Sequence, residues 1–171
     1  MKAMFQRFAA FCALVVIYVS PVGAQTRDAI REVIWKKFPD VRQLPTHELA
    51  AWLADTNRHA PLLADTREAE EFLVSHLRGA RNLGSVAAVK AAIQSNAQPV
   101  VVYCSVGYRS SALAEKLHKA GVTNVFNLEG SIFAWANEGR PVYRGTNVVQ
   151  EVHPYSKKWG ALLEERFHPK R

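Results

Sequence analysis

One cysteine stands where the sequence pattern changes from a strand to a helix. Residues 100–103 are the apolar run Val-Val-Val-Tyr, Cys104 follows them, and Gly107 comes three residues later. A thiolate here is a nucleophile, and the N–H groups of a loop and of a helix start stabilise its negative charge. Arg109 adds a fixed positive charge with a planar, anion-binding fork. The pattern predicts a nucleophilic cysteine at which a bound anion, or a negatively charged covalent adduct, is stabilised.

Two elements must position this cysteine. The run 100–103 is typical of a strand buried on both faces, and residues 110–117 favour a helix with Leu113 and Leu117 one turn apart. Cys104 is therefore expected at the carboxyl end of a buried strand, the edge of an open α/β sheet where ligands bind. Gly107 leaves the backbone free to turn back toward the sulfur.

Strand and helix patterns alternate along the chain. Strands are expected at 62–64, 80–83, 100–103 and 124–128, and helices at 28–38, 46–54, 68–75, 86–93, 110–120 and 131–137. The alternation predicts a parallel sheet covered on both faces. The apolar positions expected to face inward on the first three helices are Ile30, Val33, Ile34, Phe38, Leu49, Trp52, Leu53 and Phe72.

Four segments, in order, resemble those of rhodanese-like sulfurtransferases, and the similarity extends along most of the chain after residue 24. Residues 104–110, Cys-Ser-Val-Gly-Tyr-Arg-Ser, are similar to the active-site loop of that family. The other segments are the strand and Asp-x-Arg-Glu turn at 62–72, Ser-His-Leu-Arg-Gly-Ala-Arg-Asn at 75–82, and Asn-Val-Phe-Asn-Leu-Glu-Gly at 124–130, followed by Trp135. The chain departs from the family pattern at Ser75, Arg78 and Ser131, where the family has Gly, Pro and Gly.

The resemblance implies an α/β, rhodanese-like fold with a central, mostly parallel five-stranded sheet and helices on both faces. It implies that Cys104 is the catalytic nucleophile and carries sulfur as a persulfide. The implied substrate-binding residues are Arg109, Ser105, Val106, Gly107 and Tyr108, and the implied supporting residues are Ser110, Asp65 and Arg67. No metal or organic cofactor is implied, and one cysteine among scattered histidines is a poor metal site.

Asp65, Arg67 and His76 each have two interpretations. Asp65 and Arg67 either lie at the rim of the active site or pin the turn after the strand by capping and an ion pair. The second interpretation is preferred, as the resemblance suggests the same role in the family. His76 has the chemistry of a general acid or base. A lone histidine before a turn is more often a structural hydrogen-bonding residue, and that role is expected here.

The length of the loop separates two cysteine chemistries. Four residues lie between Cys104 and Arg109. Related cysteine phosphatases and arsenate reductases place five residues between Cys and Arg, which gives a wider cradle for a tetrahedral oxyanion. The shorter loop resembles that of sulfurtransferases and differs from the mercaptopyruvate type, which resembles Cys-Gly-Ser-Gly-Val-Thr. Thiosulfate is therefore the expected donor, with Arg109 attracting its anionic end.

Three functions from different classes follow from this loop. The leading one is a thiosulfate sulfurtransferase that passes sulfane sulfur to cyanide or a thiol through a Cys104 persulfide. The second is a persulfide carrier or partner-binding module with little turnover of small molecules. The third is an oxyanion phosphatase or arsenate reductase on the same fold. The expected partners are a small anionic sulfur donor and a protein thiol as acceptor, with no nucleic acid.

Residues 1–24 read as a secretory signal peptide. Lys2 and Arg7 precede a twelve-residue apolar run at 8–19, and Val22-Gly23-Ala24 offers a small-residue cleavage site. The run is short for a bilayer span, so membrane association is expected only if the signal is not cleaved. Cleavage before Gln25 would make the protein periplasmic or secreted. It would also remove Cys12 and leave Cys104 as the single thiol, which in an oxidising compartment suggests a reactive role.

The remaining chain divides into a helical extension at 25–45, a rhodanese-like domain at 46–143 and a basic, aromatic extension at 144–171. The formal net charge is +7, and residues 140–171 hold seven Lys or Arg against three acids. The basicity is thus largely a property of the tail and is typical of a solvated face. The tail is too apolar for a disordered segment. It either wraps over the domain or forms a docking surface edged by Lys157, Lys158 and Arg166.

Overall fold

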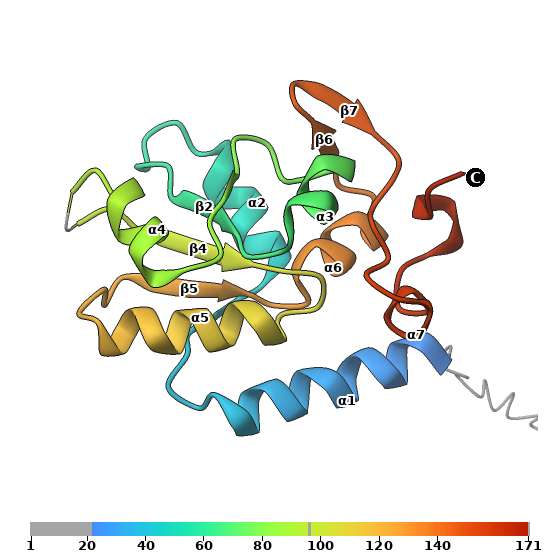
Figure 1. The fold of residues 1–171 in the computed structure, drawn as a ribbon, viewed down its shortest axis with the longest axis horizontal. Helices are drawn as coiled ribbons and strands as arrows, with labels where there is room; N and C mark the ends of the chain where they lie inside the picture. The colour runs from blue at the N-terminus through green and yellow to red at the C-terminus, as the bar shows by residue number, and fades with distance from the viewer. Residues whose placement is uncertain (1–21, 96, 171) are drawn as a thin grey trace, which may run out of the picture.

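A five-stranded sheet forms the centre of the protein in a computed structural model that describes residues 22–95 and 97–170 (Figure 1). Its strand order is β1-β5-β4-β2-β3, and every neighbouring pair is parallel. The strands are β1 (Gln43–Leu44), β2 (Leu62–Asp65), β3 (Arg81–Asn82), β4 (Val100–Tyr103) and β5 (Val125–Leu128). This confirms the predicted α/β class and the parallel five-stranded sheet.

Strand β4 is the middle strand, and all four of its residues are 0% exposed. Val100 and Val102 contribute to one hydrophobic cluster, whereas Val101 and Tyr103 contribute to another on the opposite face. Successive side chains of a strand point to opposite faces, so an uninterrupted apolar run is what a doubly covered strand requires.

Helices α1 (Val22–Lys37), α4 (Val86–Ala92) and α5 (Tyr108–Lys119) cover the first face. In Figure 1, α1 runs alongside α5 at the bottom of the view. Ile34 and Phe38 are buried there, as expected, but Val33 is 57% exposed. The prediction for Val33 was wrong because the inner face of α1 follows the spacing Ile30, Ile34, Phe38, which turns Val33 away from the core.

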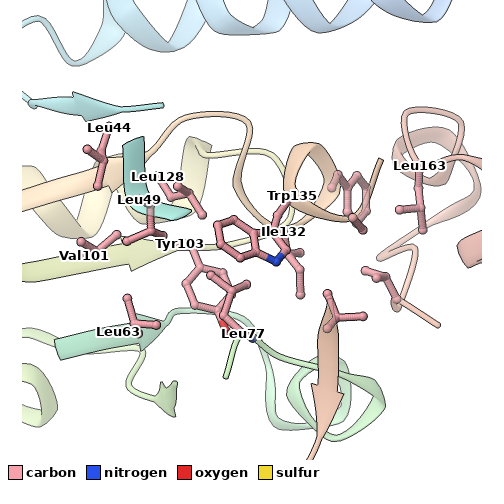
Figure 2. Close-up of a cluster of buried hydrophobic side chains, with 14 of the residues drawn as sticks. Leu44, Leu49, Leu63, Leu77, Val101, Tyr103, Leu128, Ile132, Trp135 and Leu163 are labelled. Atoms are coloured by element: carbon pink, nitrogen blue, oxygen red, sulfur yellow. Dashed lines mark hydrogen bonds between the residues drawn. The ribbon is translucent and has the colours of Figure 1, made fainter. Parts of the chain in front are cut away.

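Helices α2 (Thr46–Ala54) and α6 (Ser131–Asn137) cover the second face, with α3 (Ala69–Val74) beside them. Figure 2 shows this core, in which Leu49 and Ile132 pack around Tyr103 and Leu128. Leu53, expected to face inward, is 40% exposed. On α3 the fully inward residue is Glu71, 2% exposed, whereas Phe72 is only half-buried.

The C-terminal extension packs against the domain. A short antiparallel hairpin of β6 (Val142–Arg144) and β7 (Asn147–Val149) leads to α7 (Lys157–Gly160) and the 3₁₀ turn η1 (Glu165–Phe167). The side chains that anchor it in the core on the second face of the sheet are Val152, Leu162, Leu163 and Phe167. This geometry agrees with the interpretation of a wrapped extension.

Two further differences concern boundaries. Helix α5 begins at Tyr108 rather than at Ser110, so Tyr108 and Arg109 belong to its first turn. Strand β1, which lies in the expected helical extension, was not predicted.

Of the predicted signal peptide, residues 1–21 lie outside the described residues, and the expected cleavage site falls in the first turn of α1. Within the described part of the chain, no helix combines the length and apolarity needed to span a membrane.

Candidate active site

Cys104 lies directly after β4, at the carboxyl edge of the sheet, and is 1% exposed. Its backbone is fixed by the start of α6: the Cys104 N–H donates to Ser131 Oγ at 3.1 Å, and the Cys104 carbonyl accepts from the Ile132 N–H at 3.2 Å. Ser131 adopts a positive φ of 52°, which glycine would occupy more easily. Its hydroxyl also bonds to the Leu128 carbonyl at 3.1 Å, so the serine supplies contacts that glycine lacks.

Gly107 turns the loop back onto the sulfur. Its N–H donates to Cys104 Sγ at 3.1 Å, and its φ of +106° is one that side-chain-bearing residues rarely adopt. A Cβ at this position would lie 3.3 Å from Asn127 Nδ2 and 3.4 Å from Ile34 Cδ1. Gly107 also precedes the first residue of α5, so the sulfur lies at the N-terminal end of that helix. The expected stabilisation of negative charge on Cys104 has a structural basis here.

Ser110 connects α5 to the sheet behind the loop. Its hydroxyl donates to Asn127 Oδ1 at 2.5 Å, and Asn127 Nδ2 donates to Gln43 Oε1 at 2.7 Å. Ser110 and Asn127 are 0% and 1% exposed. Buried polar groups are stable when they are paired in this way. The chain of bonds fixes the first turn of α5 relative to β5 and β1.

Arg109 was expected to bind an anion with its guanidinium fork, and in the structure that fork already binds a carboxylate of the protein. Its Nη1 and Nη2 donate to Glu71 Oε2 at 2.7 Å and Oε1 at 2.8 Å. Nη2 also donates to Ser105 Oγ at 3.1 Å, and Ser105 Oγ donates to Glu71 Oε1 at 3.1 Å. The guanidinium of Arg109 is therefore occupied by the carboxylate of Glu71, which is the buried, inward-facing residue of α3.

The same contacts set the ionisation of the pair. Burial raises the pKa of Glu71, but hydrogen bonds from Arg109 and the Glu68 N–H, with the nearby positive charges, outweigh burial and leave that pKa lowered. Burial lowers the pKa of Arg109, but the hydrogen bonds to Glu71 and the charges of Cys104 and Glu71 leave that pKa raised. Both groups are therefore ionised near neutral pH and largely neutralise each other.

Asp65 and Arg67 form a buried pin beneath the turn after β2. Arg67 Nη2 lies 2.6 Å from Asp65 Oδ2 and also donates to the Ser75 carbonyl at 2.6 Å. Both side chains are fully buried, and neither lines the space in front of Cys104. His76 stacks on Phe72 with ring centroids 4.2 Å apart, and its Nδ1 lies 2.9 Å from the Leu77 carbonyl. These contacts agree with the structural interpretation of all three residues.

A cavity of about 480 Å³ lies in front of the sulfur. Helix α1 and the C-terminal extension supply one wall, and the loop with the first turn of α5 supplies the other. The lining residues are Thr26, Ala29, Ile30, Val33, Ile34, Cys104, Ser105, Val106, Tyr108, Arg109, Tyr155 and Trp159. We call this space the thiol chamber. A second cavity, of about 550 Å³, does not include Cys104.

The structure thus brings together most of the predicted site. Cys104, Ser105, Val106, Tyr108 and Arg109 line the thiol chamber, Gly107 bonds to the sulfur, and Ser110 braces α5 from behind. Asp65 and Arg67 lie apart from the chamber. Among the described residues, no group of three or more His, Cys, Asp or Glu side chains could hold a metal ion.

Sequence reasoning missed several residues of the site. Glu71 closes the Arg109 fork, and its signal was a second carboxylate three residues after Glu68, the spacing of a capping box, which is present here. Tyr155 places its ring 4.6 Å from the Arg109 guanidinium, and both Tyr155 and Trp159 line the chamber. Both belong to the tail, where aromatic content was the only available signal.

The fold and the site together define an α/β protein with a parallel sheet, in which a cysteine at the carboxyl edge of the sheet accepts a hydrogen bond from a loop N–H at the start of a helix. Residues 46–138 match the family described as the rhodanese-like domain. The match covers more than half of the chain, and the chain belongs to this family.

Similar proteins agree with that assignment. The chain is 31% identical over 103 residues to a sulfurtransferase of Allochromatium vinosum, covering 60% of this chain and 94% of that protein. It is 37% identical over 78 residues to the uncharacterized protein YqhL of Bacillus subtilis, covering 44% of this chain and 61% of that protein. A crystal structure of a rhodanese-related protein from Thermoplasma volcanium aligns with a TM-score of 0.51 and 26% identity, covering 60% of this chain and 98% of that one.

Proposed function

We propose that the protein is a sulfurtransferase that moves sulfane sulfur from thiosulfate to a nucleophilic acceptor through a persulfide on Cys104. The observation that carries the proposal is the N–H of Gly107 bonded to Cys104 Sγ at 3.1 Å, at the start of α5. This arrangement favours negative charge on the sulfur before transfer and on the persulfide after it. The four residues between Cys104 and Arg109 make a cradle suited to one transferred sulfur atom.

The first half-reaction loads the cysteine. The thiolate of Cys104 attacks the outer sulfur of thiosulfate and forms a new S–S bond. The original S–S bond of thiosulfate breaks, and sulfite leaves with its electron pair. In the second half-reaction an acceptor such as cyanide or a thiolate attacks the outer sulfur of the persulfide, and Cys104 leaves as a thiolate. Sulfur atoms and electrons balance, and no external oxidant is required.

The pair of Arg109 and Glu71 shapes the loop during this cycle. With its fork bound to Glu71 and Ser105, Arg109 ties the first turn of α5 to α3 and to the loop. We propose that the pair positions Ser105 and the following N–H groups around the transferred sulfur. Arg109 then attracts an anionic donor only through the part of its charge that Glu71 leaves uncompensated.

Mass analysis of the purified protein before and after thiosulfate tests the proposal. We expect a mass increase of one sulfur atom, reversed by cyanide with formation of thiocyanate, and no increase in Cys104→Ser. Serine keeps the shape of the side chain but cannot carry a transferable sulfur. An adduct that cyanide does not discharge would identify a persulfide carrier. Absence of the adduct, together with hydrolysis of a phosphate ester or reduction of arsenate, would overturn sulfur transfer.

We also propose that residues 1–24 direct export and that the mature protein, beginning at Gln25, is periplasmic or secreted. The support is the charged start, the apolar run and the small-residue site before Gln25. N-terminal sequencing of protein from an exporting host is expected to begin at Gln25. A retained Met1 in the membrane fraction would instead identify an uncleaved anchor.

A further inference from the structure

The thiol chamber is larger than its proposed donor needs. Its volume of about 480 Å³ lies within the range of pockets that hold small organic ligands, roughly 300–1,000 Å³. Thiosulfate has five heavy atoms and leaves most of this space unfilled. The additional wall comes from α1, with Ile30, Val33 and Ile34, and from the tail, with Tyr155 and Trp159. All five residues lie outside the matched family segment at 46–138.

The walls of the chamber are apolar and carry almost no net charge. Within the described part of the chain, Arg109 is the one lining residue with a permanently charged side chain, and its charge is matched by Glu71, whose side chain is 3% exposed. An anionic organic group lying on the wall formed by α1 and the tail would therefore find little attraction and would lose its hydration, whereas negative charge at the sulfur itself is stabilised by the Gly107 N–H at the start of α5. An uncharged organic group has no hydrated charge, so it can enter the chamber without that loss of hydration.

Apolar side chains at the chamber remain in water. Val33 is 57% exposed, Tyr155 48% and Tyr108 43%, and they rank among the large hydrophobic residues that the described structure leaves most exposed. Covering them with an apolar group contributes about 25 cal/mol per Å² of surface removed from water. The reactive sulfur lies among these same surfaces, because Cys104 lines the chamber with them. An occupant that reaches the sulfur therefore also covers the exposed apolar wall.

We propose that the thiol chamber binds the uncharged aliphatic or aromatic group of a small thiol, which is the sulfur acceptor. The inference rests on the proposed function for its chemistry. The acceptor thiolate attacks the outer sulfur of the Cys104 persulfide and forms R–S–S⁻. The bond between that sulfur and Cys104 Sγ breaks, and its electron pair stays on Cys104. The organic group lies against Val33, Tyr155 and Trp159 during this step.

The preference of the thiol chamber for uncharged over anionic organic groups can be measured without sulfur transfer. Methanethiosulfonate reagents convert a thiolate into a mixed disulfide and release methanesulfinate, so their rates report which organic group reaches Cys104. We expect benzyl methanethiosulfonate to modify Cys104 about tenfold faster than the sulfonatoethyl reagent, after each rate is divided by that for free cysteine. Mass spectrometry follows the adduct. Equal normalised rates, or faster reaction of the sulfonate, would overturn the proposal.

A charge placed on the chamber wall provides the decisive variant. Val33→Asp should slow the benzyl reagent roughly three- to tenfold and speed the cationic aminoethyl reagent. Val148→Asp is the matched control, because Val148 is 62% exposed on β7 and does not line the chamber. The control should leave both normalised rates unchanged. Unchanged selectivity in Val33→Asp, with native circular dichroism, would overturn the proposal, because the organic group would then not lie against this wall.

The transfer reaction gives the second measurement. Protein loaded with thiosulfate is mixed with benzyl mercaptan, with mercaptoethanesulfonate or with cyanide, which has no organic group. Val33→Asp should slow discharge by benzyl mercaptan roughly three- to tenfold more than it slows discharge by cyanide, because the new charge acts on both reactions and only the mercaptan loses an apolar contact. Failure to load with thiosulfate would overturn the proposed function, while the methanethiosulfonate rates would still decide whether the chamber selects uncharged groups.

Discussion

The guanidinium of Arg109 lies at the cysteine loop and is hydrogen-bonded to the carboxylate of Glu71. Two hydrogen bonds of 2.7 and 2.8 Å join Arg109 to Glu71, and Ser105 Oγ bonds to both side chains. A bidentate pair of this kind fixes geometry as well as charge. The electrostatic field at Cys104 is therefore set jointly by the two side chains and by the Gly107 N–H.

Replacing Glu71 by Gln should expose the charge of Arg109. Because the carboxylate no longer compensates the guanidinium, we expect the KM for thiosulfate to fall roughly three- to tenfold. Steady-state kinetics with thiosulfate and cyanide provide the measurement. The control is a neutral donor such as an organic trisulfide, whose KM should change little. A higher KM for thiosulfate would mean instead that the pair acts mainly by positioning the loop.

The same pair makes stability depend on pH. The folded pKa of Glu71 lies below its ordinary value of 4.5, so its stabilisation is present above about pH 4.5 and is lost as the pH falls through the folded pKa. Glu71→Gln should therefore be less stable than the wild type at pH 7, by about 1–3 kcal/mol.

Chemical denaturation of both proteins from neutral to acidic pH measures this difference. The gap in free energy of unfolding should narrow as the pH decreases below about 4.5. A constant gap across the whole range would show that Glu71 stabilises the fold by packing and not by its charge.

Sulfur transfer is expected to depend on the length of the loop between β4 and α5. Four residues separate Cys104 from Arg109, and Gly107 must reach the φ of +106° that directs its N–H to the sulfur. An inserted residue after Gly107 should widen the loop and displace that N–H. We expect sulfur transfer to fall by at least tenfold, equivalent to about 1.4 kcal/mol, from loss of one charge-assisted hydrogen bond.

The thiosulfate–cyanide assay measures this loss, and a phosphate ester and arsenate serve as comparison substrates. Phosphate or arsenate turnover in the insertion variant would support the view that loop size separates the two chemistries. Thiosulfate activity equal to that of the wild type would contradict it.

Elements with strong local patterns could be predicted from the sequence, and those that depend on distant partners could not. Strand β4 and helix α6 match their predicted ranges because burial imposes a continuous or periodic apolar pattern. Strand β1 has two residues, which carry no periodicity, and it exists because it pairs with β5. Glu71 points inward because Arg109, far along the chain, provides its partner. The tail likewise gains its role at the chamber only from the folded arrangement.

At the scale of the whole molecule, the C-terminal extension is part of the core. Leu162, Leu163 and Phe167 are each less than 8% exposed and pack in the cluster that contains Tyr103. Removal of residues 160–171 should therefore lower stability, with each of these side chains contributing about 1–3 kcal/mol. The thermal unfolding midpoint should decrease markedly.

Activity of the truncated protein is measured well below its unfolding midpoint, where the rate with cyanide should stay within about threefold of the wild type, since Cys104 and its loop are retained. An unchanged midpoint with loss of transfer to a protein thiol would show that the segment is a docking element. The full-length chain carrying Leu162→Ala provides a milder variant that loses packing alone.

The pairing of β1 with β5 has a consequence for how the chain folds. Gln43 meets Asn127 across a separation of 84 residues, and the Asn127 amide bonds to the Gln43 side chain. Closing so long a loop reduces chain entropy before the contact forms, and topologies rich in distant pairings fold slowly. During synthesis the edge strand at 43–44 cannot pair with β5 until most of the chain has been made. We therefore expect the sheet edge, and with it the bracing of the cysteine loop through Asn127 and Ser110, to form late in folding.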